Sequence, residues 1–152
     1  ASVDAVDAVR RALYLLEPEC QQLGVTPVLE APQPVTVRAD PVALDQIVHN
    51  LIQNALQALA HTPTAQRRLR LTVSAHPQMA DITVADNGPG FAPEVLPRLF
   101  EPFFTTRPGG LGLGLSLCQT LAQGMDGTLE AAQAPEGGAV FRLQLPLATR
   151  TP

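Results

Sequence analysis

Lysine is absent from this chain of 152 residues, in which every basic side chain is an arginine. P-loop nucleotide binding, Schiff-base catalysis and pyridoxal-phosphate attachment all need a lysine, so these chemistries are excluded. The chain has 14 acidic and 10 basic residues, which gives a formal net charge of −4. Nucleic acids and anionic membranes attract clustered positive charge, so we expect a poor membrane binder with no nucleic acid partner.

Cysteine is also scarce. Cys20 and Cys118 lie far apart, each alone in an apolar helical pattern. Such a pair is more typical of free thiols in the core of a cytoplasmic domain than of a disulfide. His49, His61 and His76 form no spaced set with the cysteines, which argues against a zinc site.

Long apolar runs are missing as well. No run approaches the roughly 18 residues of a membrane span, and no basic segment precedes an apolar one at the start. We therefore expect a soluble, cytoplasmic chain without an export signal. The length and the 45% hydrophobic content suit one globular domain over residues 1–152, with residues 147–152 as a frayed tail.

Hydrophobic periodicity predicts the order of helices and strands. Asp40 followed by Pro41 marks the start of the longest helix, because the first is a side-chain cap and the second suits a first helical turn. Helices grouped between runs of strands favour an α+β fold: a two-layer α/β sandwich whose mixed, mostly antiparallel sheet is covered on one face by helices. We expect helices over residues 3–23, 41–60, 93–99 and 115–123, and strands over residues 25–30, 35–38, 69–75, 81–85, 128–132 and 139–145.

The long helix carries an uncharged polar stripe made of Gln46, Asn50, Asn54 and Gln57. A merely solvated face would normally contain glutamate or arginine, which form helices better than asparagine does. An asparagine amide oxygen is a neutral, hard ligand that can coordinate magnesium. The helix taken alone is still compatible with an idle polar surface.

A glycine-containing turn follows the strand over residues 81–85. Asp86 stands where the alternation breaks, and Gly88 and Gly90 permit a positive φ and a close approach of a ligand to the backbone. Aspartate and glycine also populate ordinary turns, so a simple turn remains the alternative.

A second glycine-rich segment, residues 110–114, leads directly into a helix. Helix N-termini present unpaired N–H groups and a positive dipole end, and glycines let phosphate oxygens reach them. The spacing fits neither the dinucleotide pattern, which would need glycine at Leu115, nor the P-loop. A plain flexible loop is the alternative.

Together, and in this order, these segments resemble the ATP-binding catalytic domain of sensor histidine kinases. That family shares a superfamily, and the Bergerat-type ATP-binding fold, with DNA gyrase, mismatch-repair ATPases and heat-shock chaperones. The segment Asn50–Ala55 resembles the N box, and Asp86–Gly90 the first glycine box. Phe100–Arg107 resembles the F box, and Gly110–Ser116 the second glycine box.

The resemblance implies a role for each matching residue. Asp86 would receive the adenine amino group, Asn54 would bind the Mg²⁺ ion that bridges the phosphates, and Asn50 would lie near both. Residues 105–112 would form a lid, and Arg107 could reach the γ-phosphate, so Asn50 and Arg107 are the implied catalytic residues. The implied ATP-binding set is Asn50, Asn54, Gln57, Asp86, Gly88, Gly90, Phe91, Thr105, Thr106, Arg107, Gly110, Leu111, Gly112, Leu113, Gly114 and Leu115.

The sequence departs from the family pattern at two positions. Gln57 occupies a position where many relatives carry a cation that reaches phosphate. Ala139 replaces a threonine that is common in the last strand, although Gly138 and Phe141 match. The short lid resembles that of the nitrogen-regulation and dicarboxylate-sensing branch.

A general base for water is missing. Superfamily members that hydrolyse ATP carry a glutamate four residues before the magnesium asparagine, where this chain has Asn50, whose amide cannot take a proton. The resemblance therefore implies transfer of the γ-phosphoryl group to a histidine. His49, His61 and His76 are not followed by an acidic residue, so we expect the acceptor on a dimerisation domain that this chain lacks.

The implied partners are that dimerisation and histidine-phosphotransfer domain and the receiver domain of a response regulator. The isolated domain is expected to be monomeric and the full-length kinase homodimeric, with anchoring in the inner membrane left open. A serine kinase of the anti-sigma type or an ATPase of the same superfamily is one alternative, against which Asn50 argues. A catalytically silent nucleotide-binding docking module is the other.

Overall fold

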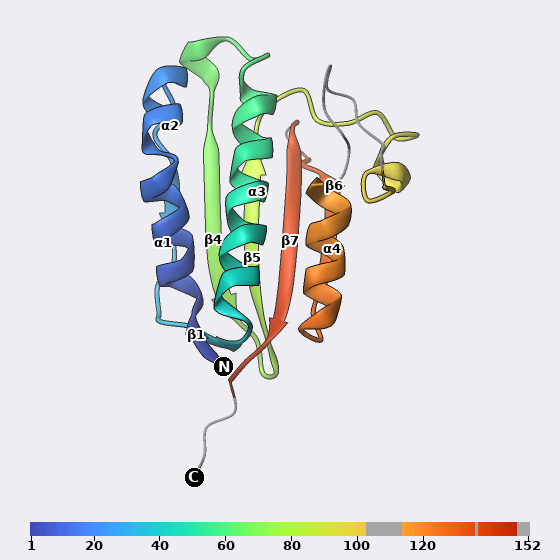
Figure 1. Cartoon of the computed structure of the whole chain (residues 1–152). Coiled ribbons are helices and arrows are strands. Elements are labelled where there is room, and N and C mark those ends of the chain that lie inside the picture. Colours follow the sequence, from blue (N-terminus) through green and yellow to red (C-terminus); the bar gives the residue numbers. More distant parts are fainter. Residues whose placement is uncertain (103–113, 136, 149–152) are drawn as a thin grey trace.

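The computed structural model describes residues 1–102, 114–135 and 137–148. Its centre is a five-stranded sheet in the order β2-β4-β5-β7-β6, in which β2 runs parallel to β4 and the other neighbours are antiparallel. Helices cover one face of this sheet (Figure 1). The predicted α+β fold class is therefore confirmed. The main strands are β2 (Val28–Glu30), β4 (Leu69–Ala75), β5 (Met79–Asp86), β6 (Thr128–Gln133) and β7 (Ala139–Pro146).

Helix α3 (Pro41–Leu59) lies at the middle of the helical layer (Figure 1). The Asp40 carboxylate caps it by accepting hydrogen bonds from the N–H groups of Val42 and Ala43, at 2.9 and 3.3 Å. Pro41 occupies the first turn, as predicted. The apolar residues of α3 at helical spacing are buried against the sheet, so one face of the helix is fixed and its polar stripe faces away: Leu44, Ile47, Val48, Leu51, Ile52, Ala55 and Leu59.

The other helices in this layer are α1 (Ala5–Leu15) and α4 (Gly114–Gly124), on either side of α3 (Figure 1). Alternate residues of β4, β5 and β7 point into the core beneath them. Cys20 and Cys118 are both buried and free, which confirms the prediction for the thiols. Among the described helices, none is long and apolar enough to cross a membrane.

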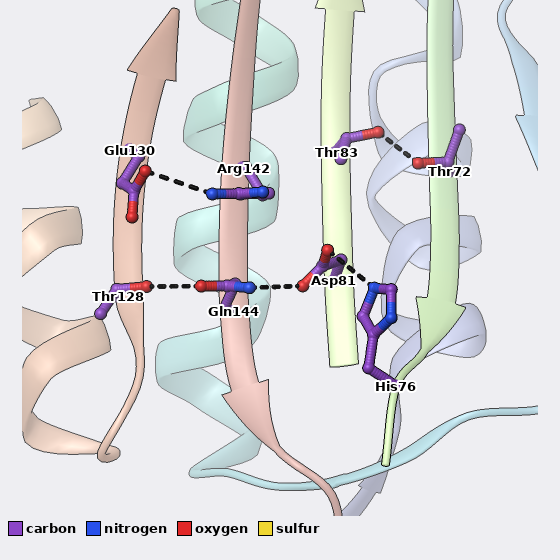
Figure 2. Close-up of polar contacts among 8 residues, drawn as sticks. All are labelled: Thr72, His76, Asp81, Thr83, Thr128, Glu130, Arg142 and Gln144. Atoms are coloured by element: carbon purple, nitrogen blue, oxygen red, sulfur yellow. Dashed lines mark hydrogen bonds and ion pairs between the residues drawn. The ribbon is translucent and has the colours of Figure 1, made fainter. Parts of the chain in front are cut away.

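The opposite face of the sheet is polar and carries cross-strand pairs (Figure 2). One row runs from the His76 ring to Asp81 at 3.1 Å, from Asp81 to the Gln144 amide at 2.9 Å, and from Gln144 to the Thr128 hydroxyl at 3.3 Å. A second row pairs Thr72 with Thr83, and Arg142 with Glu130. These side chains thus satisfy one another, and no helix of the described ranges covers them (Figure 1 and Figure 2).

The N-terminal region differs from the sequence prediction of one helix over residues 3–23. It forms a short strand, β1 (Ser2–Asp4), then α1 and a separate helix, α2 (Glu17–Leu23). Pro18 lies in the first turn of α2, and proline cannot donate the hydrogen bond that would continue α1 through this point. The break therefore follows from a single residue.

The strands predicted at 25–30 and 35–38 are present as β2 and β3 (Thr36–Arg38). β3 pairs with β1 in a small separate sheet, and β2 joins the main sheet. One further segment differs from its prediction. The helix expected over 93–99 is only a short 3-10 turn at Leu96–Arg98, and another such turn lies at Thr64–Gln66.

Candidate functional site

Two asparagines of the polar stripe form the first part of the candidate site. Asn50 and Asn54 are half-buried and lie one helical turn apart on α3, and the Asn54 amide nitrogen donates to the Asn50 side-chain oxygen at 3.3 Å. This bond uses the nitrogen of Asn54 and leaves its amide oxygen to act as an acceptor or a metal ligand. Gln46 and Gln57, at the two ends of the stripe, are exposed.

The start of α4 packs against the first of these asparagines. A Cβ on Gly114 would lie only 2.9 Å from the Asn50 side-chain nitrogen and 3.2 Å from its oxygen. Because glycine has no side chain, the helix N-terminus can approach the amide this closely. Leu115, the next residue, is partly buried and packs against the core. The structure thus joins the end of the second glycine-rich segment to the Asn50–Asn54 pair.

A buried carboxylate forms the other part of the candidate site. Asp86, the last residue of β5, is 5% exposed, and its carboxylate accepts a hydrogen bond from the Gly88 N–H at 2.9 Å. Burial raises the pKa of Asp86 above its usual value, while backbone N–H groups of Gly88 and Ala139 act to lower it. Ala139, one of the two departures from the family pattern, thus serves the carboxylate through its backbone.

Glycines pack tightly around this carboxylate. A Cβ on Gly88 would lie 3.0 Å from the Ala58 carbonyl oxygen of α3 and 3.0 Å from the carboxylate itself. Gly138, at the start of β7, has φ +90°, and its α-carbon faces the Asp86 backbone carbonyl with no room for a side chain. The glycines are therefore needed at these positions, and they bring three segments of backbone together beside Asp86.

Sequence reasoning missed two residues that hold the loop after Asp86. The Asn87 side chain accepts from the Arg68 N–H at 2.7 Å and donates to the Gln66 carbonyl at 2.6 Å, which ties the loop to the start of β4. The Gln133 side chain, from β6, bonds the backbone of Phe91. An asparagine inside a turn is a recognisable signal, whereas a glutamine at a strand end looks like ordinary surface.

The remaining predicted site residues lie partly inside and partly outside the described ranges. Gly90 and Phe91 lie in the loop after Asp86, where the Phe91 ring packs edge to face on Phe141 with 6.3 Å between ring centroids. Thr105, Thr106, Arg107, Gly110, Leu111, Gly112 and Leu113 lie outside the described residues. The described part of the site therefore combines a buried carboxylate, a pair of amides and a helix N-terminus.

These groups define what the site can do chemically. The Asp86 carboxylate can accept a hydrogen bond from an N–H group of a ligand, and the Asn54 oxygen can hold a hard cation. The N-terminus of α4, with its unpaired N–H groups, favours a negatively charged ligand. A nucleotide with a bound divalent cation presents all three of the matching groups.

Comparison with known proteins agrees with this geometry. Residues 39–149 match the family of histidine kinase-, DNA gyrase B- and HSP90-like ATPases. The C4-dicarboxylate transport sensor protein DctB of Pseudomonas aeruginosa is 39% identical over 147 residues, which are 95% of this chain and 24% of that protein. The chain therefore spans about a quarter of the length of this relative.

Solved structures give the same result. The catalytic domain of histidine kinase ThkA superposes with a TM-score of 0.85 at 25% identity, covering 96% of both chains. Full-length ShkA in complex with AMPPNP superposes with a TM-score of 0.85 at 32% identity, covering all of this chain and 32% of ShkA. ThkA has also been solved in complex with the response regulator protein TrrA. That ThkA chain is 23% identical with a TM-score of 0.82, and the match covers 97% of this chain and 42% of that chain.

The family model covers well over half of the chain, and the arrangement of the sheet and helices is that of histidine kinase catalytic domains. The curated relative is a sensor protein of the same family. This chain is a histidine kinase-type ATPase domain and belongs to the histidine kinase-, DNA gyrase B- and HSP90-like ATPase family.

Proposed function

We propose that this domain binds Mg-ATP and donates the γ-phosphoryl group to a histidine on a separate domain of a sensor kinase. The observation that carries the proposal is the packing on one helix, α3: the N-terminus of α4 packs on Asn50 of the Asn50–Asn54 pair, and Gly88, which bonds Asp86, packs on the Ala58 carbonyl. The membership in the family and the AMPPNP bound to ShkA support a nucleotide as the ligand.

Asp86 receives the adenine amino group in this proposal. Its backbone donors occupy part of the carboxylate, and Gly88 and Gly138 place backbone rather than side chains beside Asp86. Gly90 and Phe91 continue the same loop and border the base. A base that presents an acceptor oxygen to this buried carboxylate would leave both groups without a hydrogen bond, which costs binding free energy. The site therefore favours a base with an amino group.

The residues present also fit a magnesium ion. Mg²⁺ keeps several waters and is usually held by one or two protein oxygens together with substrate phosphates, and the free amide oxygen of Asn54 supplies such a ligand. When bound, the ion neutralises charge on the phosphates during transfer. Asn50 orients Asn54 through their hydrogen bond, and the α4 N-terminus at Gly114 and Leu115 faces the phosphates.

The residues outside the described ranges complete the proposal. Thr105, Thr106, Arg107 and the segment from Gly110 to Leu113 would cover the triphosphate, with Arg107 neutralising the γ-phosphate. Gln57, exposed at the end of the stripe, would contact phosphate as a neutral donor. Catalysis would then consist mostly of positioning and charge neutralisation by this chain.

The histidines of this chain do not serve as the acceptor in this proposal. His76 lies at the turn between β4 and β5, at the opposite end of β5 from Asp86, and pairs with Asp81. Eight residues of strand separate the two ends, which is about 25 Å. The acceptor would belong to the dimerisation domain of a homodimeric kinase, and a receiver domain would take the phosphoryl group onward, as the ThkA–TrrA complex suggests.

Radiolabelled ATP tests the proposal. The isolated domain should bind Mg-ATP without labelling itself or turning over, because it has no glutamate base at position 50. Addition of the parent's dimerisation domain should produce acid-labile labelling of that domain. Steady phosphate release by the isolated domain would favour the ATPase alternative, label on a serine would favour a serine kinase, and binding with no transfer would indicate a silent docking module.

A further inference from the structure

Gln133 reaches from the end of strand β6 to the loop that follows Asp86. Its side-chain oxygen accepts a hydrogen bond from the Phe91 N–H at 2.9 Å, and its side-chain nitrogen donates to the Phe91 carbonyl oxygen. One side-chain amide thus pairs with both backbone polar groups of one residue, as a neighbouring strand would. The two partners are 42 positions apart in the sequence.

Two further contacts lie on either side of this bridge. Gly90 has φ +71°, and its α-carbon lies so close to the Gln133 amide that a Cβ would not fit between them. On the other side, the Phe91 ring packs edge to face on Phe141 of β7. The backbone from Gly90 to Phe91 is therefore held between the side chain of Gln133 and the core.

The β6–β7 hairpin that carries Gln133 also packs against Asp86. In this hairpin Gln133 is paired with Ala139, whose backbone N–H acts to lower the pKa of the Asp86 carboxyl. Gly138, next to it, packs on the Asp86 backbone carbonyl. The turn end of the hairpin thus fixes the carboxylate and the loop after it relative to each other.

We propose that Gln133 is a positioning residue for the base site: it holds the Gly90–Phe91 backbone at the distance from Asp86 that adenine requires. This inference rests on the proposed function, since it takes Asp86 as the group that receives adenine. Gln133 does not touch the nucleotide in this account. It acts by fixing the loop, so its loss should weaken the recognition of the base more than the stability of the fold.

Gln144 provides a matched control within the same hairpin. Its side chain also makes two hydrogen bonds, to Asp81 and to Thr128, but it lies at the other end of the hairpin, on the open face of the sheet (Figure 2). Removal of either glutamine costs the hairpin two side-chain bonds. Of these two glutamines, only Gln133 bonds to the described part of the loop after Asp86.

The experiment measures the affinities for Mg-ATP and Mg-GTP by calorimetry, together with the thermal midpoint without nucleotide. The proteins are the unmodified domain, Gln133→Ala, Gln133→Glu and Gln144→Ala. We expect both Gln133 variants to bind ATP about tenfold more weakly with GTP nearly unchanged, so that the preference for ATP falls about tenfold. Gln133→Glu keeps the shape but turns an oxygen toward the Phe91 carbonyl, so it tests hydrogen bonding rather than size.

Gln144→Ala should lower the thermal midpoint by as much as Gln133→Ala and leave the ATP preference unchanged. An unchanged ATP preference in the Gln133 variants, or an equal loss in Gln144→Ala, would overturn the positioning role. If the unmodified domain binds neither nucleotide, the proposed function itself fails. If Gln133→Ala does not fold, the Gln133→Glu variant decides the question by the same ratio.

Discussion

Strand β5 carries two buried carboxylates that have different surroundings. Asp81 lies on the open face of the sheet at 9% exposure, and side chains bond both of its oxygens: His76 one of them and Gln144 the other (Figure 2). Asp86 lies on the helical side at 5% exposure, and only backbone N–H groups are its partners among the described contacts. Five positions on one strand separate a carboxylate that completes a surface network from one that we propose receives a ligand.

The difference follows from what each face of the sheet can offer. On the open face, long polar side chains from neighbouring strands reach a carboxylate easily, and the resulting network needs no further partner. Near the helical layer, glycines at positions 88 and 138 bring backbone close to Asp86 instead of side chains. Backbone donors stabilise the charge without filling the space beside it. A buried acid surrounded by glycines is therefore better evidence for a site than burial alone.

The largest expected effect comes from Asp86→Asn, which breaks the comparison at the carboxylate that we propose receives adenine. Guanine presents a carbonyl oxygen where adenine has its amino group, so the unmodified domain should prefer ATP over GTP by about a hundredfold, or ~2.7 kcal/mol. The variant keeps the shape, replaces the charged acceptor for adenine with a neutral amide and can offer an N–H to guanine. We expect a large loss of ATP affinity and a much smaller gap between the two nucleotides.

Calorimetric titration of ATP and GTP into both proteins measures all four dissociation constants. Equal affinities of the unmodified domain for ATP and GTP would show that Asp86 is only a turn residue. In that case both carboxylates of β5 would be structural, and the contrast between them would have no functional meaning.

Asn54→Ala should have the next largest effect, because it removes an amide oxygen without touching the buried face of α3. We expect Mg-ATP affinity to fall about tenfold, with the free energy of unfolding changed by less than about 1 kcal/mol. Gln46→Ala is the matched control, since Gln46 lies on the same stripe but at its exposed N-terminal end.

Titrations of nucleotide with magnesium and with a chelator separate the two contributions of Asn54. The difference between Asn54→Ala and the unmodified domain should disappear when the metal is removed. If Asn54→Ala binds Mg-ATP normally, the metal is held by other groups.

Asp81→Asn should affect stability slightly and nucleotide binding not at all. The new amide keeps an oxygen for the Gln144 donor and presents an N–H₂ group toward the His76 ring, which a neutral imidazole can accept. We expect a change of about 1 kcal/mol or less in the free energy of unfolding, measured by urea titration. A loss of ATP affinity close to that of Asp86→Asn would instead mean that the two carboxylates act together through β5.

The sequence predicted the parts of this molecule that depend on local patterns. The cap at Asp40, the alternation in β4 and β5 and the glycines after Asp86 all act within a few residues, and the structure has them where they were expected. The break at Leu16 was equally local but was hidden, because the apolar period continues through it. The position of Pro18 could have revealed it.

The parts that could not be predicted depend on contacts between distant segments. Gln133 and Phe91 are 42 positions apart, and Gly114 meets Asn50 across 64 positions. The motifs indicated that Asp86 and Asn54 share a site. They did not indicate which residues hold the loop after Asp86 in place. The partners of β2 and β3 were not predicted for the same reason, since short strands carry no signal for the sheet they join.

The last prediction uses pH to test the burial of the Asp86 carboxyl. Burial raises the pKa of Asp86 above its ordinary value of 3.8, so the folded protein holds this proton at a pH where the unfolded chain has lost it. Because the folded state binds more protons in that window, the contribution of Asp86 to stability falls as the pH rises from 3.8 to the raised pKa. Asp86→Asn cannot ionise, so its stability relative to the unmodified domain should rise across the window and then stay level.

Urea titrations at a series of pH values from about 3 to 8 measure this difference. The double variant Asp81→Asn/Asp86→Asn should show the same rise in stability relative to the single variant Asp81→Asn. The reason is that the single variant retains Asp86 and its partners. A difference that falls with pH would mean that the backbone donors of Gly88 and Ala139 outweigh burial, so that Asp86, like Asp81, is held by a satisfied network.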